Sequence, residues 1–219
     1  MTDKRITIFS GHYGSGKTNI AVNYATDIAK GGKKTTIADL DIVNPYFRTK
    51  DSEQELNSAG VNLICSEYAN SNVDIPALPQ EMYCITDDTK TTFVLDVGGD
   101  ERGALALGRL TPKIVEENSY EMLFVANFFR PLTETADQAL QVMSEIENAC
   151  GLKFSAIVNN SNLGAITTKE DILKSSAKAE DLSKLSNLPI RFTSADEMLK
   201  SVFGDEDYNI YFLKLQKRM

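Results

Sequence analysis

The chain of 219 residues is 42% hydrophobic and 25% charged, with a formal net charge of −8. These values are ordinary for a globular protein with a sizeable core, and the charge argues against nucleic acid as main ligand, because the basic residues are scattered. No apolar run approaches the roughly 20 residues of a membrane span, and the N-terminus has no apolar signal core. We therefore expect one domain over residues 1–219, in the cytoplasm, with neither nucleic acid nor a membrane as partner.

Short apolar runs alternate with longer segments of helical periodicity along the chain. Several runs, among them IADL, FVLDV and MLFVAN, are almost continuously apolar, which is typical of strands covered on both faces. The alternation predicts an α/β fold, a doubly wound and mostly parallel sheet with helices on both faces. Strands are predicted at residues 6–10, 35–40, 61–65, 92–97, 122–127, 154–159 and 190–193. Helices are predicted at residues 17–30, 52–59, 79–86, 103–116, 133–150, 168–185, 195–203 and 208–217.

The turn between the first strand and the first helix reads GHYGSGKT and fits the pattern G-x-x-x-x-G-K-[ST]. Its glycines let the backbone curl, so that successive N–H groups face phosphate oxygens, and the helix N-terminus adds a positive dipole end. Lys17 can place its charge on the β- and γ-phosphates, and the Thr18 hydroxyl can ligate Mg²⁺. The alternatives are a glycine-rich turn that only caps a βα unit, and a dinucleotide fingerprint, which fits worse. The nucleotide-binding residues predicted here are Gly11, Gly14, Ser15, Gly16, Lys17, Thr18 and Asn19.

Carboxylates follow two later strands at the edge where open α/β sheets build their ligand crevice. Asp39 and Asp41 end the second strand and can hold Mg²⁺ through water and orient an attacking water. Asp96 ends the strand FVLDV and is the expected second magnesium carboxylate. It opens a D-x-x-G pattern in which the N–H of Gly99 can reach the γ-phosphate and move when that phosphate leaves. A simple strand-ending turn is the alternative for each carboxylate.

The segment from residue 67 to 91, between these two strands, is the least regular part of the chain. It is rich in Asn, Ser and Asp, and we expect an excursion on the surface of the core. Later in the chain, Thr167 and Glu170 have the spacing of a capping box at the start of a helix.

Three asparagines, Asn159, Asn160 and Asn162, follow the strand FSAIV, where a base could be bound. Guanine-specific P-loop proteins usually present an Asp at the position of Asn162, and an Asn amide can instead pair with N6 and N1 of adenine. This difference favours ATP over GTP. A polar turn without a ligand is the alternative.

The three cysteines, Cys65, Cys84 and Cys150, lack a C-x-x-C spacing, so we expect reduced, mostly buried thiols and no zinc or iron–sulfur site.

On the motifs GHYGSGKT, ADLD, VLDVGG and VNNSN, the chain resembles the ParA/MinD branch of P-loop proteins, in the SIMIBI class. The resemblance covers most of the chain. It implies a seven- or eight-stranded sheet, ATP with Mg²⁺, and slow hydrolysis coupled to a nucleotide-dependent homodimer.

The resemblance also assigns roles to residues of this chain. It implies that Lys17 and Asp41 are catalytic, with Asp41 positioning the attacking water, and that Thr18, Asp39 and Asp96 support magnesium. Asn159 or Asn160 would meet the adenine.

One position departs from the pattern of the family, whose P-loop usually reads K-G-G-x-G-K-[ST]. The first lysine, which reaches the phosphate of a partner subunit, is replaced here by His12. The change moves the chain toward relatives with an ordinary P-loop, including small-molecule kinases and synthetases. The amphipathic C-terminus, which in the MinD branch binds membrane, is expected here to be a helix docked on the sheet.

Three functions follow from these observations. The leading hypothesis is an ATPase switch in which ATP and Mg²⁺ order residues 41–48 and 98–109, and whose output is contact with a protein partner. The runner-up is a kinase or ligase for a small anionic metabolite, with ATP as co-substrate. The third is a regulator that binds ATP without turnover. In the runner-up, the acceptor pocket would be lined by His12, Arg48, Arg102 and Arg130.

Overall fold

A computed structural model describes residues 4–41, 49–65, 80–204 and 209–215. Within them, eight strands form one sheet in the order β3-β2-β4-β1-β5-β6-β7-β8, and each neighbouring pair is parallel. The doubly wound α/β sheet predicted from the sequence is confirmed. The strands are β1 (Ile6–Ser10), β2 (Thr35–Leu40), β3 (Val61–Cys65), β4 (Thr92–Val97), β5 (Tyr120–Ala126), β6 (Ala156–Asn159), β7 (Ile190–Asp196) and β8 (Ile210–Leu213).

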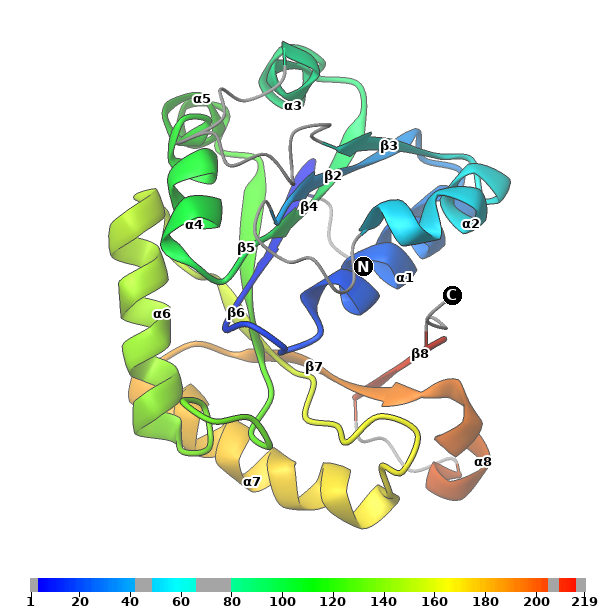
Figure 1. Cartoon of the computed structure of the whole chain (residues 1–219), viewed down its shortest axis with the longest axis vertical. Coiled ribbons are helices and arrows are strands. Elements are labelled where there is room, and N and C mark those ends of the chain that lie inside the picture. Colours follow the sequence, from blue (N-terminus) through cyan, green and yellow to red (C-terminus); the bar gives the residue numbers. More distant parts are fainter. Residues whose placement is uncertain (1–3, 42–48, 66–79, 205–208, 216–219) are drawn as a thin grey trace.

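Helices cover both faces of this sheet, which is why the strands read as continuous apolar runs. Alternate side chains of one strand enter different clusters: Leu123 and Val125 of β5 pack with α1, whereas Met122 and Phe124 pack on the other face. Figure 1 shows α1 and α2 on one side of the sheet and α4 and α6 on the other. The helices are α1 (Lys17–Lys30), α2 (Glu53–Ser58), α3 (Cys84–Asp87), α4 (Glu101–Gly108), α5 (Thr111–Glu117), α6 (Ala136–Cys150), α7 (Lys169–Ser186) and α8 (Lys200–Phe203).

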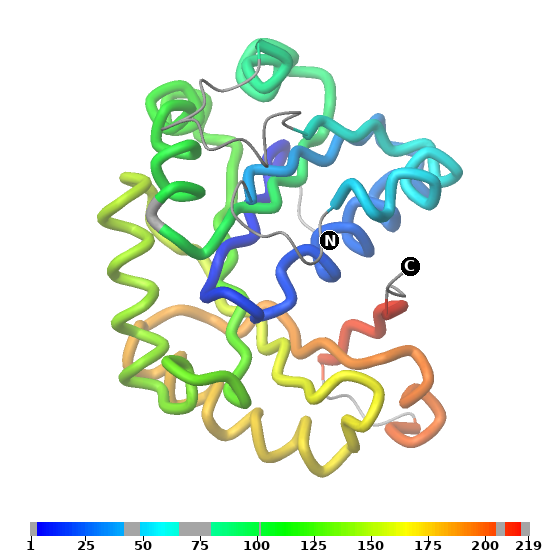
Figure 2. Tube along the Cα trace, in the orientation of Figure 1, coloured from blue at the N-terminus to red at the C-terminus, as the bar shows by residue number. Residues whose placement is uncertain are grey.

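The C-terminal segment is the main error of the sequence prediction. Residues 210–213, expected within a helix, form the edge strand β8. Tyr211 and Leu213 face the cluster around α1, and Ile210 and Phe212 face the cluster around α8. Figure 2 shows this strand beside α1, where Asn23 exchanges hydrogen bonds with the main chain of Lys214. The segment is apolar on two faces, which a strand between two layers satisfies.

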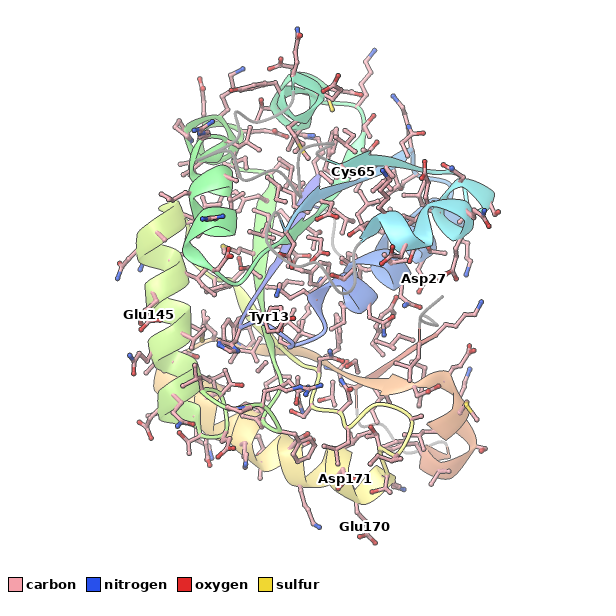
Figure 3. The ribbon with its side chains drawn as sticks, in the orientation of Figure 1. Tyr13, Asp27, Cys65, Glu145, Glu170 and Asp171 are labelled. Atoms are coloured by element: carbon pink, nitrogen blue, oxygen red, sulfur yellow. The ribbon has the colours of Figure 1, made fainter. Side chains whose placement is uncertain are left out.

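Smaller differences also have local causes. The helix predicted at 103–116 is two helices, since Pro112 occupies the first turn of α5. The helix predicted at 195–203 starts later, because β7 continues to Asp196. The capping box of α7 lies one residue further on than predicted and is formed by Thr168 and Asp171. Figure 3 labels Asp171 at the start of that helix. Of the irregular segment 67–91, residues 67–79 lie outside the described residues.

Of the three cysteines, Cys150 is buried, and Cys65 and Cys84 are half-buried.

Strand β1 lies between β4 and β5, so the chain order reverses on either side of it. Parallel strands bring the loops at their carboxyl ends together at one edge, and ligands of such sheets bind at this reversal. The loops after β1, β4, β5 and β6, and Asp41 after β2, therefore meet where the sequence motifs lie.

Candidate nucleotide-binding site

The loop between β1 and α1 has the backbone that a phosphate cradle requires. Gly14 and Gly16 have φ values of 75° and 85°, a region that favours glycine, and Gly16 directly precedes α1. An ideal Cβ on Gly16 would lie 2.3 Å from Nδ2 of Asn160, so no larger residue fits there. The N-terminus of a fourteen-residue helix therefore opens onto a loop that only glycine can form.

Asn160 supports this loop from the end of β6. Its Nδ2 donates a hydrogen bond of 2.6 Å to the carbonyl of Ser15, and its Oδ1 accepts one from Ser194. The neighbouring Asn159 is fully buried, donating to Ser175 and accepting from Ser161. Asn159 and Asn160, one of which was predicted to meet adenine, thus have their amides bound to protein groups.

Lys17 and Thr18 begin α1 and are both buried. The ammonium of Lys17 donates to the carbonyl of His12 at 3.4 Å, so the side chain folds back over the loop. A buried ammonium is stable only with a negatively charged group nearby. The carboxylate of Asp96 lies close enough to interact with it electrostatically. Lys17 therefore stands between the loop and the carboxylates of the neighbouring strands.

Asp96 is fully buried at the end of β4. Its Oδ2 accepts a hydrogen bond of 3.1 Å from Thr49, and Thr18 bonds to the same carboxylate. Its Oδ1 has no hydrogen-bond partner among the described residues, although it is buried. Burial and the charge of Asp41 raise the pKa of Asp96 to about 6, against the opposing effects of Lys17 and Thr18. A buried carboxylate oxygen without a partner is costly, and a cation would satisfy it.

Asp39 and Asp41 lie on the adjoining strand end. Asp39 is paired in register with Asp96 across β2 and β4, and its Oδ1 accepts a hydrogen bond of 3.0 Å from the main-chain N–H of Asp41. Both carboxylates are largely buried. The structure thus brings the three predicted carboxylates to one place, beside Lys17 and Thr18.

The loop after β4 closes against the P-loop. An ideal Cβ on Gly99 would lie 1.9 Å from the carbonyl oxygen of Gly11, and one on Gly98 would lie 3.0 Å from Oδ1 of Asp41. Asp100 then caps α4, where its side chain accepts from the N–H of Gly103 at 2.9 Å. The loop after β4 is therefore in close contact with the P-loop and with Asp41.

These residues fit a magnesium ion that is held partly by phosphates. The described residues contain no cluster of three His, Cys, Asp or Glu side chains that could hold a metal alone. Mg²⁺ in nucleotide sites does not need such a cage, because one hydroxyl or carboxylate, waters and phosphate oxygens complete its octahedron. Thr18 and the unpartnered oxygen of Asp96 supply protein ligands of that kind.

A small cavity lies next to Asn160, where the loops after β6 and β7 meet. Its volume is about 20 Å³, which is enough for one water molecule. A purine could bind there only if the lining residues moved apart. Asn162 lines it, although the amide of Asn162 bonds to its own loop at Asn160 and Gly164. The cavity is lined by Asn160, Asn162, Gly164, Thr167, Ile172, Ser194, Ala195, Asp196, Leu213 and Leu215.

The sequence analysis missed three residues of this region, namely Thr49, Ser194 and Asp196. Thr49 precedes α2 and Ser194 lies in β7, and no motif marks either. Asp196 is the last residue of a strand, and Asp41 and Asp96 also lie at strand ends, so that placement could have signalled it.

Of the four residues proposed for an acceptor pocket, three are described. His12 is half-buried with its Nδ1 against the carbonyl of Tyr13 at 3.0 Å, and Arg102 is exposed on the first turn of α4. Arg130 is exposed in the loop after β5 and lies beside Gly14. Arg48 lies outside the described residues, as does the rest of segment 42–48.

Comparison with known proteins identifies a family. The family model described as the CobQ/CobB/MinD/ParA nucleotide binding domain matches residues 6–187. The sequence matches no curated protein. Among the helices of the described residues, none has the length and apolar character to cross a bilayer.

Several solved structures share the fold. FtsY from Mycoplasma mycoides is similar with a TM-score of 0.54 and 20% identity, over 89% of this chain and 61% of that one. Cell division protein FtsY from Thermotoga maritima has a TM-score of 0.59 and 15% identity, over 89% and 62%. The signal recognition particle 54 kDa protein from Aeropyrum pernix, solved in complex with GDP, has a TM-score of 0.53 and 13% identity, over 88% and 41%. The chain thus spans about three-fifths or less of these neighbours' lengths.

Proposed function

Because the chain belongs to the CobQ/CobB/MinD/ParA nucleotide-binding domain family, we propose that it is a magnesium-dependent ATP-binding switch that hydrolyses ATP slowly and acts on a protein partner. The observation that carries the proposal is the convergence of Lys17, Thr18 and Asp96 beside the P-loop glycines. Without an anionic ligand and a cation, this arrangement would leave a carboxylate oxygen buried and unpartnered.

Each side chain has a chemical role in this proposal. Lys17 neutralises charge on the β- and γ-phosphates, and Thr18 and Asp96 hold Mg²⁺, with Asp39 supporting them. Asp41 orients the attacking water. When bound, Mg²⁺ would polarise the phosphoryl oxygens and stabilise the charge that develops on them. The phosphates would be cradled by N–H groups of the loop and of the first helical turn, with a further one from the loop after β4: Gly11, Gly14, Ser15, Gly16, Lys17, Thr18, Asn19 and Gly99.

The base is proposed to lie near Asn160 and Asn162, with Asn159 supporting that loop from below. We propose ATP over GTP, because Asn162 carries an amide where a carboxylate would accept from both ring donors of guanine. The Aeropyrum pernix neighbour was solved with GDP, so both purines belong in the test.

Two features support a switch. Thr49 follows segment 42–48 and bonds to Asp96 at 3.1 Å, and Gly99 packs against Gly11. A change in charge at the phosphate site therefore acts directly on the segments after β2 and β4. Tyr13, labelled in Figure 3 on the P-loop, is 54% exposed, and Leu105 of α4 is 45% exposed. Exposed large apolar side chains next to a switch suit a protein interface, either with a second copy or with another protein.

Phosphate release from Mg·ATP and from Mg·GTP tests the proposal. We expect slow release from ATP, less from GTP, and none above background for Lys17→Ala. Asp41→Ala should bind ATP and fail to hydrolyse it. If Lys17→Ala hydrolyses ATP as fast as the wild type, the P-loop is not the site. If phosphate appears only when a small anionic metabolite is added, the chain is a kinase or ligase.

A further inference from the structure

The loop after β5, residues 127–135, is fixed by hydrogen bonds, although its residues 130–132 are exposed. Asn127 is its hub: its Oδ1 accepts from the N–H of Phe129 at 3.0 Å, and its carbonyl accepts from Thr133 and from the N–H of Arg130. The loop is also tied to the neighbouring one, because the N–H of Phe128 donates to Ser161 at 2.9 Å. Such bonds fix the direction in which Arg130 leaves the backbone.

One residue of this loop is strained. Leu132 has a φ of 67° and is 60% exposed. A leucine in the left-handed region costs free energy, and little burial compensates here. The turn around Leu132 is closed by a hydrogen bond from the N–H of Thr133 to the carbonyl of Arg130, which maintains a conformation that the leucine itself disfavours.

Arg130 lies against the P-loop. An ideal Cβ on Gly14 would be 3.9 Å from Nε and 4.0 Å from Cδ of Arg130. Gly14 is two residues from His12, whose carbonyl receives the ammonium of Lys17, the cation for the β- and γ-phosphates. Arg130 thus borders the same end of the cradle. Within the described part of the chain, no carboxylate forms an ion pair with its guanidinium.

We infer that Arg130 is a second phosphate-binding cation of this site, contributed by the same chain from the loop after β5. The inference rests on the proposed function. A guanidinium presents a planar fork of donors that matches two phosphate oxygens, and it stays charged at every physiological pH. Its partner is the β- or γ-phosphate of the bound nucleotide, next to Lys17.

Calorimetric titration with Mg·ATP and with AMP, using four variants, tests this role. Arg130→Ala should weaken Mg·ATP binding by about tenfold to a hundredfold, the usual effect of losing a hydrogen bond to a charged group. Arg130→Lys should lose less, since it retains the charge. The control is Arg109→Ala, which removes the same charge from an exposed residue at the C-terminal end of α4. It should bind like the wild type, and AMP affinity should not change in any of these three variants.

The fourth variant separates the two proposals. If Lys17→Ala binds Mg·ATP like the wild type, the proposed function fails. If Lys17→Ala loses binding while Arg130→Ala retains it, only the role of Arg130 is wrong. Equal losses for Arg130→Ala and Arg109→Ala would also overturn the role, because they would show a long-range effect of net charge. Melting temperatures without nucleotide should be the same for Arg130→Ala and the wild type, and a lower value for Arg130→Ala would indicate a structural role.

Discussion

The carboxylate of Asp96, a proposed site residue, lowers the stability of the folded chain. It is fully buried, one oxygen lacks a partner among the described residues, and its pKa is raised to about 6 by burial and by Asp41. An unfolded chain would hold the proton only below the ordinary value of 3.8. Between these two pH values the folded chain binds more protons than the unfolded one, so stability falls as pH rises through this window.

Asp96→Asn should therefore stabilise the protein when no nucleotide is added. We expect a gain on the order of 2 kcal/mol at pH 7, and a smaller gain at pH 5, because a neutral amide removes the buried charge. The same variant should lose the stabilisation that Mg·ATP gives the wild type. Urea unfolding at both pH values, with and without Mg·ATP, measures both effects.

Asp87→Asn is the contrasting variant. Its carboxylate is exposed and bonded to Lys113, which lowers its pKa, so the amide should bring no gain at pH 7. A destabilised Asp96→Asn protein at pH 7 would show that the carboxylate is placed for the fold and not for a ligand.

Among single residues, the sequence predicted the positions of those that belong to motifs. Lys17, Thr18 and Asp96 could be placed together because parallel strands end at one edge of a sheet. Thr49 could not, because it returns to Asp96 only after segment 42–48, and contacts of that kind depend on how a loop closes. The asparagine pair lies at a strand end, as predicted, but periodicity cannot say that Asn159 points to Ser175 and Asn160 to Ser15.

Among the elements, β8 shows where local pattern and tertiary structure conflict. Residues 208, 211, 212 and 215 have the spacing of one helical face, so a helix was predicted. The structure places Tyr211 against Tyr24 and Phe192, and Phe212 against Phe203 on the opposite face. A strand with two apolar faces lacks the alternation of polar and apolar residues that identifies a half-exposed strand. Whether this segment forms a helix or a strand depends on the packing of α1 on one face and α8 on the other.

The contact between β8 and α1 should contribute measurably to stability. The hydroxyl of Tyr211 donates to Asp27 at 2.7 Å, and the half-buried ring packs edge-on against Tyr24. Tyr211→Phe should lower the free energy of unfolding by about 1 kcal/mol, because Asp27 loses a hydrogen bond and the ring is retained. Chemical denaturation measures this.

Tyr83→Phe is the matched control, since this ring is 41% exposed. It should leave stability within about 0.5 kcal/mol of the wild type, as surface changes usually do. Equal effects of the two substitutions would show that the Tyr211 hydroxyl does not anchor the last strand.

For the whole molecule, the layered sheet could be predicted because each strand and helix carries its own signal. The eight-stranded order, with β1 between β4 and β5, follows from no single segment. That order brings Asp41, after β2, and the loop after β4 next to the P-loop. We propose that the terminal phosphate of ATP, held by Lys17, changes residues 49–58 and 98–108 together.

Hydrogen exchange in the presence of Mg·ATP, Mg·ADP or no nucleotide tests this claim most directly. Peptides covering residues 49–58 and 98–108 should exchange more slowly with ATP than with ADP, whereas the middle of α6 should not distinguish the two. Lys17→Ala should abolish the difference. Equal exchange of both segments with ATP and ADP in the wild type would contradict the account, because the site would then bind nucleotide without acting as a switch.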